Sequence, residues 1–158
     1  MYSRQEASQI RQQFYTRLGQ YMAPILSASG ERQNWLNYKT GIRHIYIRMD
    51  TPNRGASIGF TLAHPDRAIR LEQFEKFSQV KALLQSAAEV LPEPVELNWT
   101  WERETFNETG QVISRIYEAL PGKSVLNQND WPDLISFFKP RLITLDQFWN
   151  DVKFQFET

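Results

Sequence analysis

The 158-residue sequence contains no cysteine and only two histidines, His44 and His64. The missing thiols exclude disulfide bonds, cysteine nucleophiles and every zinc site that needs thiolate ligands. The two histidines lack the short spacing of a metal-binding helix motif, so we expect each to be a surface or helix-capping residue. The sequence therefore predicts no metal site, and the lack of cysteine fits a reducing compartment.

Long apolar runs are also missing. No stretch approaches the roughly 20 apolar residues that a membrane-spanning helix needs. The first six residues, Met1 to Glu6, are polar, and the apolar segment of a signal peptide does not follow them. We therefore expect a cytoplasmic protein with no membrane contact.

The sequence also lacks a glycine-rich phosphate-binding loop. The seven glycines are scattered over turn positions, and no GxxxxGK[ST] pattern occurs. The sequence predicts no cofactor and assigns no catalytic residue. An enzyme whose site is built from dispersed residues remains the third and weakest of three functional hypotheses.

Three segments have apolar residues spaced by three and four, which is typical of amphipathic helices. Ser3 and Glu6 form a capping box before the first segment, and Asp66 caps the second. These signals predict helices over residues 3–22, 66–91 and 130–152. Pro140 lies inside the last pattern and is expected to kink or split that helix.

Five shorter segments have the composition or alternation of strands, namely residues 35–38, 43–50, 57–62, 95–102 and 111–120. The predicted order is α-β-β-β-α-β-β-α. The fold class is therefore α+β, with a mainly antiparallel five-stranded sheet packed with three helices in a single domain over residues 1–158. In the segment 57–62, small residues on one face leave room for a helix of the same chain. They are Ser57, Gly59 and Thr61.

One strand carries the most suggestive group of polar residues. Tyr46, Arg48 and Asp50 alternate with apolar residues, so they share one face. Lys39 and Arg54 lie beyond the two ends of that strand. Arginine and tyrosine together suit the binding of an anion or a base, and these five residues form the predicted binding site. A solvated strand face with an ion pair between Arg48 and Asp50 gives the same pattern.

The predicted order α-β-β-β-α-β also resembles that of restriction-endonuclease-like nucleases. That resemblance implies an aspartate on the second strand, and a glutamate and a lysine on the third, to hold magnesium. Asp50 lies at the end of the second predicted strand. The third, residues 57–62, has neither a carboxylate nor a lysine. The sequence therefore argues against an active nuclease and leaves a degenerate scaffold of that kind open.

Three strings carry a closer resemblance that covers nearly the whole chain. They are Trp35 to Ile42 (WLNYKTGI), Tyr46 to Met49 (YIRM) and Ile135 to Arg141 (ISFFKPR). In these the sequence resembles the domain-of-unknown-function family 4268. The resemblance implies a bacterial origin and no assigned activity.

Two functional hypotheses follow. The first is a non-catalytic binding or protein-interaction module, with a second copy of the chain or another protein as partner. The second is a nucleic-acid-associated domain, because residues 1–54 hold eight Lys/Arg against three Asp/Glu while residues 55–158 hold ten against fifteen. The balanced total charge does not favour strong nucleic-acid binding, and an uneven distribution also arises by chance.

Overall fold

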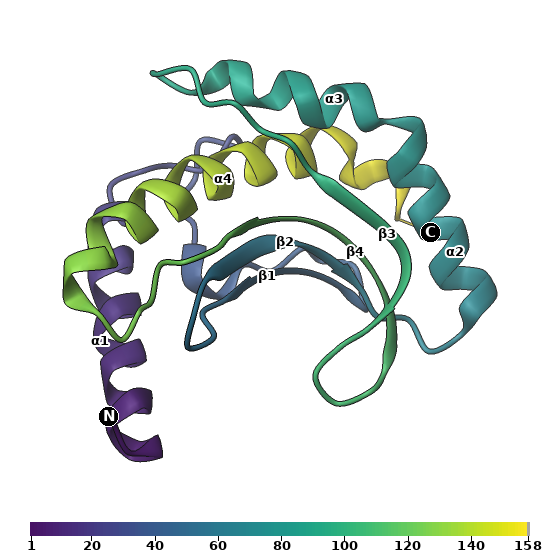
Figure 1. Ribbon diagram of the computed structural model, residues 1–158. Coiled ribbons are helices and arrows are strands. Elements are labelled where there is room, and N and C mark those ends of the chain that lie inside the picture. The colour runs from purple at the N-terminus through teal and green to yellow at the C-terminus, as the bar shows by residue number, and fades with distance from the viewer. Residues whose placement is uncertain (158) are drawn as a thin grey trace.

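The computed structural model describes residues 1–157 and forms a curved antiparallel sheet of four strands, with α4 above its convex face (Figure 1). The strands lie in the order β1-β2-β4-β3. They are β1 (Ile45–Asp50), β2 (Ala56–Leu62), β3 (Thr100–Phe106) and β4 (Val112–Leu120). The α-helices are α1 (Arg4–Met22), α2 (Arg67–Gln79), α3 (Lys81–Ser86) and α4 (Trp131–Val152).

The class is α+β, but the prediction of five strands and three helices is wrong. The structure has four strands and four α-helices. The segment predicted as the first strand contains the 3-10 helix η1 (Trp35–Asn37). Its aromatic side chains are fixed by the surrounding chain, because the Trp35 indole N–H donates to the Ile25 carbonyl at 3.0 Å and the Tyr38 hydroxyl donates to Asp146. The backbone of residues 35–37 forms a 3-10 turn and pairs with no strand of residues 1–157.

The observed order, α-β-β-α-α-β-β-α, also removes the basis for the nuclease comparison. That comparison needed three strands before the second helix, and only β1 and β2 occur there. The first helix does match its prediction, since the Ser3 hydroxyl accepts from the Glu6 N–H and the Glu6 carboxylate accepts from the Ser3 N–H.

The predicted helix over residues 66–91 is divided. Asp66 caps α2 as expected, accepting from the Ile69 N–H at 3.2 Å. At Val80 the backbone leaves helical geometry (φ −109°, ψ 20°) and α2 gives way to α3. The bend allows Phe77 of α2 and Leu84 of α3 to be buried in the same core. The 3-10 helix η2 (Ala87–Val90) ends the segment.

The last helix, in contrast, runs through Pro140 as one element, so the predicted split does not occur. A proline has no N–H, which leaves the carbonyl four residues earlier without its helical partner. Here that carbonyl belongs to Ser136, an exposed residue, so water can take the place of the missing donor. On the following turn, the Thr144 hydroxyl donates to the Pro140 carbonyl at 2.9 Å.

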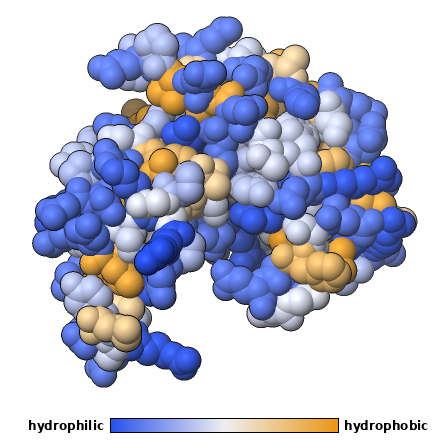
Figure 2. All heavy atoms as spheres, viewed as in Figure 1, coloured by the Kyte–Doolittle hydropathy of each residue, from blue (hydrophilic) through white to orange (hydrophobic). Residues whose placement is uncertain are grey.

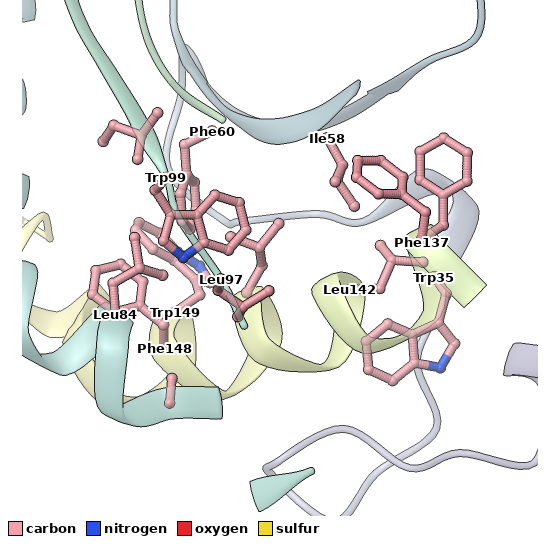
Figure 3. Packing of buried hydrophobic residues seen from close by; sticks show 14 of the residues in the cluster. Trp35, Ile58, Phe60, Leu84, Leu97, Trp99, Phe137, Leu142, Phe148 and Trp149 are labelled. Carbon is pink, nitrogen blue, oxygen red and sulfur yellow. The ribbon is translucent and has the colours of Figure 1, made fainter. Parts of the chain in front are cut away.

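The core lies between the sheet and α4. Phe60 of β2 contacts Phe77, Phe148 and Trp149, with ring centroids 4.9–5.7 Å apart. Figure 3 shows Ile58 and Phe60 directed from the sheet toward the side chains of α4. Phe138 and Trp149, eleven residues apart and therefore on one face of a helix, are both buried.

A buried carboxylate fixes the long loop between α1 and β1 to α4. Asp146 is 2% exposed and accepts hydrogen bonds from the Ser27 hydroxyl, the Ala28 N–H, the Tyr38 hydroxyl and the Asn150 amide. Burial, together with the Asp146 carboxylate, raises the pKa of Tyr38, so its hydroxyl stays a donor at neutral pH. The buried Asp146 side chain is therefore satisfied by four hydrogen-bond donors, none of which is a basic side chain.

The concave face of the sheet is not crossed by any helix of residues 1–157 (Figure 1). The expectation that a helix lies on the small residues of β2 is therefore wrong. The small residue Gly59 instead lets the backbone of the neighbouring strand come close, since a Cβ atom on it would stand 2.0 Å from the Ile116 carbonyl oxygen of β4. Within the same described range, no helix has the length and apolar character needed to cross a bilayer.

Candidate functional site

The open face is our name for the concave side of the sheet, the side away from α4. Burial alternates along β1, so that Ile45 faces the core while Tyr46, Arg48 and Asp50 face the open side. Strand register carries this face across β2 to β4, since Arg48 lies opposite Gly59 and Gly59 opposite Tyr117. The open face comprises Tyr46, Arg48, Asp50, Ser57, Gly59, Thr61, Arg115 and Tyr117.

Two arginine–tyrosine pairs stand on this face. The guanidinium carbon of Arg48 lies 4.3 Å from the Tyr46 ring centroid on β1, and that of Arg115 lies 4.1 Å from the Tyr117 ring centroid on β4. The small residues of β2 separate the two pairs. Stacking on a ring holds a guanidinium in place while its N–H groups remain free to donate.

The charges of the two arginines are compensated differently. Arg115 lies 4.0 Å from the Asp50 carboxylate and 3.4 Å from the Ser57 hydroxyl. Arg48 forms no ion pair with any carboxylate of residues 1–157. The Glu102 carboxylate, followed by partial burial, raises the pKa of the Tyr117 hydroxyl. The open face thus presents the neutral hydroxyl of Tyr117 and one arginine, Arg48, that has no carboxylate partner within residues 1–157.

The β3–β4 hairpin forms one wall of a hollow on this face. The hollow has a volume of about 250 Å³, and its lining includes Arg48, Asp50, Arg115, Phe106 and Glu108. Phe106 is 70% exposed, although it is large and apolar. Figure 2 shows the surface indented between the N-terminal end of α1 and the hairpin, with mostly hydrophilic residues around the indentation.

The structure brings together four of the five predicted site residues. Tyr46, Arg48 and Asp50 share the open face, and Arg54 lines a neighbouring hollow of about 370 Å³ with Asp50. Lys39 is exposed but lines neither hollow. Arg115 and Tyr117 were missed. Their alternation in β4 repeats the pattern of β1, but only the pairing of β2 with β4 places them beside Arg48.

Gly55 to Gly59 also match the GxSxG pattern of a hydrolase nucleophile turn. That chemistry needs a serine at a sharp turn between a strand and a helix, with a histidine in hydrogen-bond reach. Ser57 instead lies within β2, opposite Asp50, whereas His44 and His64 flank the other end of the β1–β2 pair. About six residues of strand, or roughly 20 Å, separate them. The GxSxG pattern of residues 55–59 therefore does not form an acyl-transfer site.

The acidic residues of the hairpin do not gather into a metal site. A register shift between Glu102 and Thr105 interrupts the alternation of β3. Glu104 is bound by Arg67 at 2.6 Å and by Arg70 at 3.3 Å, and the hydrogen bond from Arg67 lowers its pKa. Within residues 1–157, no group of three or more metal-ligating side chains comes together.

The two histidines lie side by side at the start of β1, with ring centroids 4.8 Å apart. His44 has a left-handed backbone (φ 70°), which few residues other than glycine and asparagine adopt. The Nδ1 atom of His64 accepts from the Asp66 N–H at 3.0 Å. Loss of hydration, followed by the charge of His64, lowers the pKa of His44.

This shift predicts a loss of stability at mildly acidic pH. The unfolded chain protonates His44 near pH 6.5, whereas the folded protein does so only at a lower pH. The unfolded state therefore binds more protons in that window, and stability falls as the pH falls through it. We expect the urea midpoint to decrease between pH 7.5 and 5.5, and to decrease less in His44→Asn. An equal decrease in both proteins would contradict the assignment.

Comparison with known proteins gives one match. The family model described as a domain of unknown function (DUF4268) matches residues 10–153. No curated protein and no solved structure matches the chain.

Proposed function

Because the chain belongs to the DUF4268 family, whose description names no activity, we propose a function from the geometry of the open face: a non-catalytic module that binds an anionic ligand. The observation that carries the proposal is the pair of stacked arginines, Arg48 and Arg115, which face one hollow from two strands.

The arrangement of the arginines suits recognition of a carboxylate or phosphate. A guanidinium presents N–H groups in a planar fork that matches two oxygens. Tyr46 and Tyr117 hold the two guanidinium groups in place before a ligand arrives, so less side-chain entropy is lost on binding. Because Arg48 has no carboxylate partner within residues 1–157, a bound anion could pair with Arg48 without displacing one of those carboxylates.

Binding is favoured over catalysis by the titratable groups of the site. A general acid or base works best with a pKa near the working pH. The pKa of Tyr117 is raised above its ordinary value, which moves it away from neutrality. This shift of Tyr117 favours holding a ligand on the open face over moving a proton there.

A protein or a small molecule suits the site better than nucleic acid. Binding of a nucleic-acid backbone relies on many cations that neutralise successive phosphates. The hollow instead combines two arginines with Asp50 and Glu108, so a single anionic group fits it better. Nucleic-acid binding is retained as one outcome of the test.

The test compares Arg48→Ala, Arg115→Ala and the wild type. The probes are inorganic phosphate, ATP, short single-stranded DNA and RNA, and an acetylated hexaglutamate peptide, each titrated by calorimetry. We expect at least one probe to bind the wild type, and each variant to lose about 10- to 100-fold in affinity, the worth of a charged hydrogen bond.

Arg32→Ala is the matched control, because Arg32 is an exposed arginine that lines neither hollow. It should bind like the wild type, and circular dichroism should show all four proteins folded. Equal binding of every probe by all four would exclude the open face as the site. Length-dependent binding of DNA or RNA would support the nucleic-acid hypothesis instead.

A further inference from the structure

We propose that the outer edge of β1 binds an extended acidic peptide segment as an added strand. The proposal rests on the proposed function in one respect, the role of Arg48 in attracting the acid. Its other support is independent of that function, because it comes from the main chain of β1.

The direction of the β1 peptide groups follows from hydrogen bonds at its first residues. The His44 carbonyl accepts from the Ala63 N–H beyond β2 at 2.9 Å, so this residue faces the sheet. Ile45 faces the other way. Its N–H donates to the Ile42 carbonyl at 3.2 Å and its carbonyl accepts from the Thr40 hydroxyl at 2.6 Å.

Antiparallel pairing alternates, so that every second residue of an edge strand directs its peptide groups outward. In β1 these residues are Ile45, Ile47 and Met49, and the series continues to Thr51. The Thr51 carbonyl accepts from the Arg11 guanidinium at 2.8 Å. Among residues 1–157, the outer edge is therefore closed at Ile45 and at Thr51, and it is open at Ile47 and Met49.

A groove follows this open stretch. It has a volume of about 510 Å³ and is lined by every residue of β1 from Tyr46 to Asp50. Successive residues point to opposite faces of a sheet, so only the strand edge lets all five line one groove. Tyr15 of α1 and the segment 36–38 line it too. Leu36 and Tyr46 are 37% and 38% exposed, which adds apolar surface to the groove.

These features define the chemistry of the bound segment. Addition of a strand supplies main-chain partners for Ile47 and Met49, as in other peptide-binding sheets. The residue opposite Arg48 shares the open face with it, where an acidic side chain pairs best. The peptide residues before and after it point to the other face of the sheet, the face of the Ile47 and Met49 side chains, where apolar side chains pack. The segment is therefore an acidic residue between two apolar residues.

A single peptide suits the groove better than a second copy of the chain. Strands in a sheet lie about 4.8 Å apart, so one strand fits beside β1. Because Tyr15 and the segment 36–38 line the same groove, the further strands of a second copy would meet them. Self-association is therefore an alternative result that the experiment must detect.

The experiment uses the full chain and two nine-residue peptides. They have Val-Glu-Val or Val-Gln-Val at their centre and differ only in the middle residue, Glu or Gln. With the Glu peptide, we expect hydrogen exchange of the Ile47 and Met49 amides, followed by NMR, to slow at least fivefold. The amides of Tyr46 and Arg48, already paired with β2, should change little. The Gln peptide should bind about fivefold more weakly, the worth of a cross-strand pair.

Ile47→Pro tests the main-chain contact, because proline removes an outward N–H and is tolerated on an edge strand. It should lower affinity for the Glu peptide at least tenfold, whereas Ile47→Ala, which keeps the N–H, should lower it less. If Ile47→Pro does not fold, a peptide N-methylated at both valines provides the same test against the wild type.

The results separate this proposal from the proposed function. Unchanged exchange at Ile47 and Met49, or normal binding by Ile47→Pro, would overturn strand addition even if Arg48→Ala abolishes binding of small anions. Equal binding of the Glu and Gln peptides, both blocked by Ile47→Pro, would retain strand addition and remove the role of Arg48. A wild-type dimer that Ile47→Pro converts to monomer, measured by sedimentation without peptide, would overturn the peptide assignment.

Discussion

Trp149→Ala is expected to lower the free energy of unfolding by about 3–5 kcal/mol, the usual cost of removing a large buried aromatic side chain. Trp149 is 2% exposed. Its ring is nearly parallel to that of Phe77, with an interplanar angle of 13° and centroids 6.2 Å apart. Its indole N–H donates to the buried Thr40 carbonyl at 2.8 Å. Alanine would leave a cavity and an unpaired carbonyl at the same place.

Urea denaturation of the purified variant at 25 °C measures this loss. Trp149→Phe is the matched control, because it keeps much of the packing and removes the N–H, and it should cost less. A loss below about 1 kcal/mol for Trp149→Ala would mean that the side chain is not buried in solution.

Gly59→Ala is the second substitution with a large expected effect, a loss of about 3 kcal/mol or more. A Cβ atom at this position would stand 2.0 Å from the Ile116 carbonyl oxygen and 2.5 Å from the Tyr117 Cα. Both atoms belong to the backbone of β4, which cannot move aside as a flexible side chain can. The added methyl group would therefore separate the two central strands of the sheet.

Gly19→Ala provides the control for Gly59→Ala, because it makes the same chemical change in α1. Its Cβ would meet only the tip of the Leu36 side chain, at 3.1 Å. In a helix, alanine is favoured over glycine by about 0.5–1 kcal/mol, so this variant should unfold at an equal or higher urea concentration. Equal stability of both variants would show that the backbones of β2 and β4 are farther apart at Gly59 than in this structure.

The sequence could predict those parts of the fold in which the repeat period of one strand or helix determines which of its side chains are buried. The alternation of Tyr46, Arg48 and Asp50 against apolar neighbours was sufficient to assign the two faces of β1. The three-and-four spacing through Phe138 and Trp149 likewise identified the buried side of α4. In both cases the period of the element fixes which side chains share a face.

The failures have a common cause in tertiary contacts. Trp35 and Tyr38 have the composition of a strand, but their polar atoms bind a loop carbonyl and Asp146, more than a hundred residues away in the second case. The division at Val80 and the register shift in β3 likewise have no counterpart in the apolar spacing of the sequence. Propensity is a weak prior wherever such contacts compete with it.

The candidate site was half predictable for the same reason. Arg48 and its neighbours lie on one strand and could be recognised together. Arg115 and Tyr117 lie almost seventy residues later, and they join the site only because β2 pairs with β1 on one side and with β4 on the other. Strand order is a property of the whole sheet, and no single segment of the sequence records it.

The position of α4 after all four strands in the sequence has a consequence for synthesis. This helix covers the apolar face of the sheet, and it also fixes the loop near the N-terminus, since Trp149 and Thr40 are 109 residues apart. A ribosome that adds about 5–20 residues per second needs roughly 5–20 s to proceed from the end of β2 to the end of α4. During that interval Phe60 has Phe77 of α2 as a partner but lacks Phe148 and Trp149 of α4, so part of the apolar face stays exposed until α4 has been synthesised.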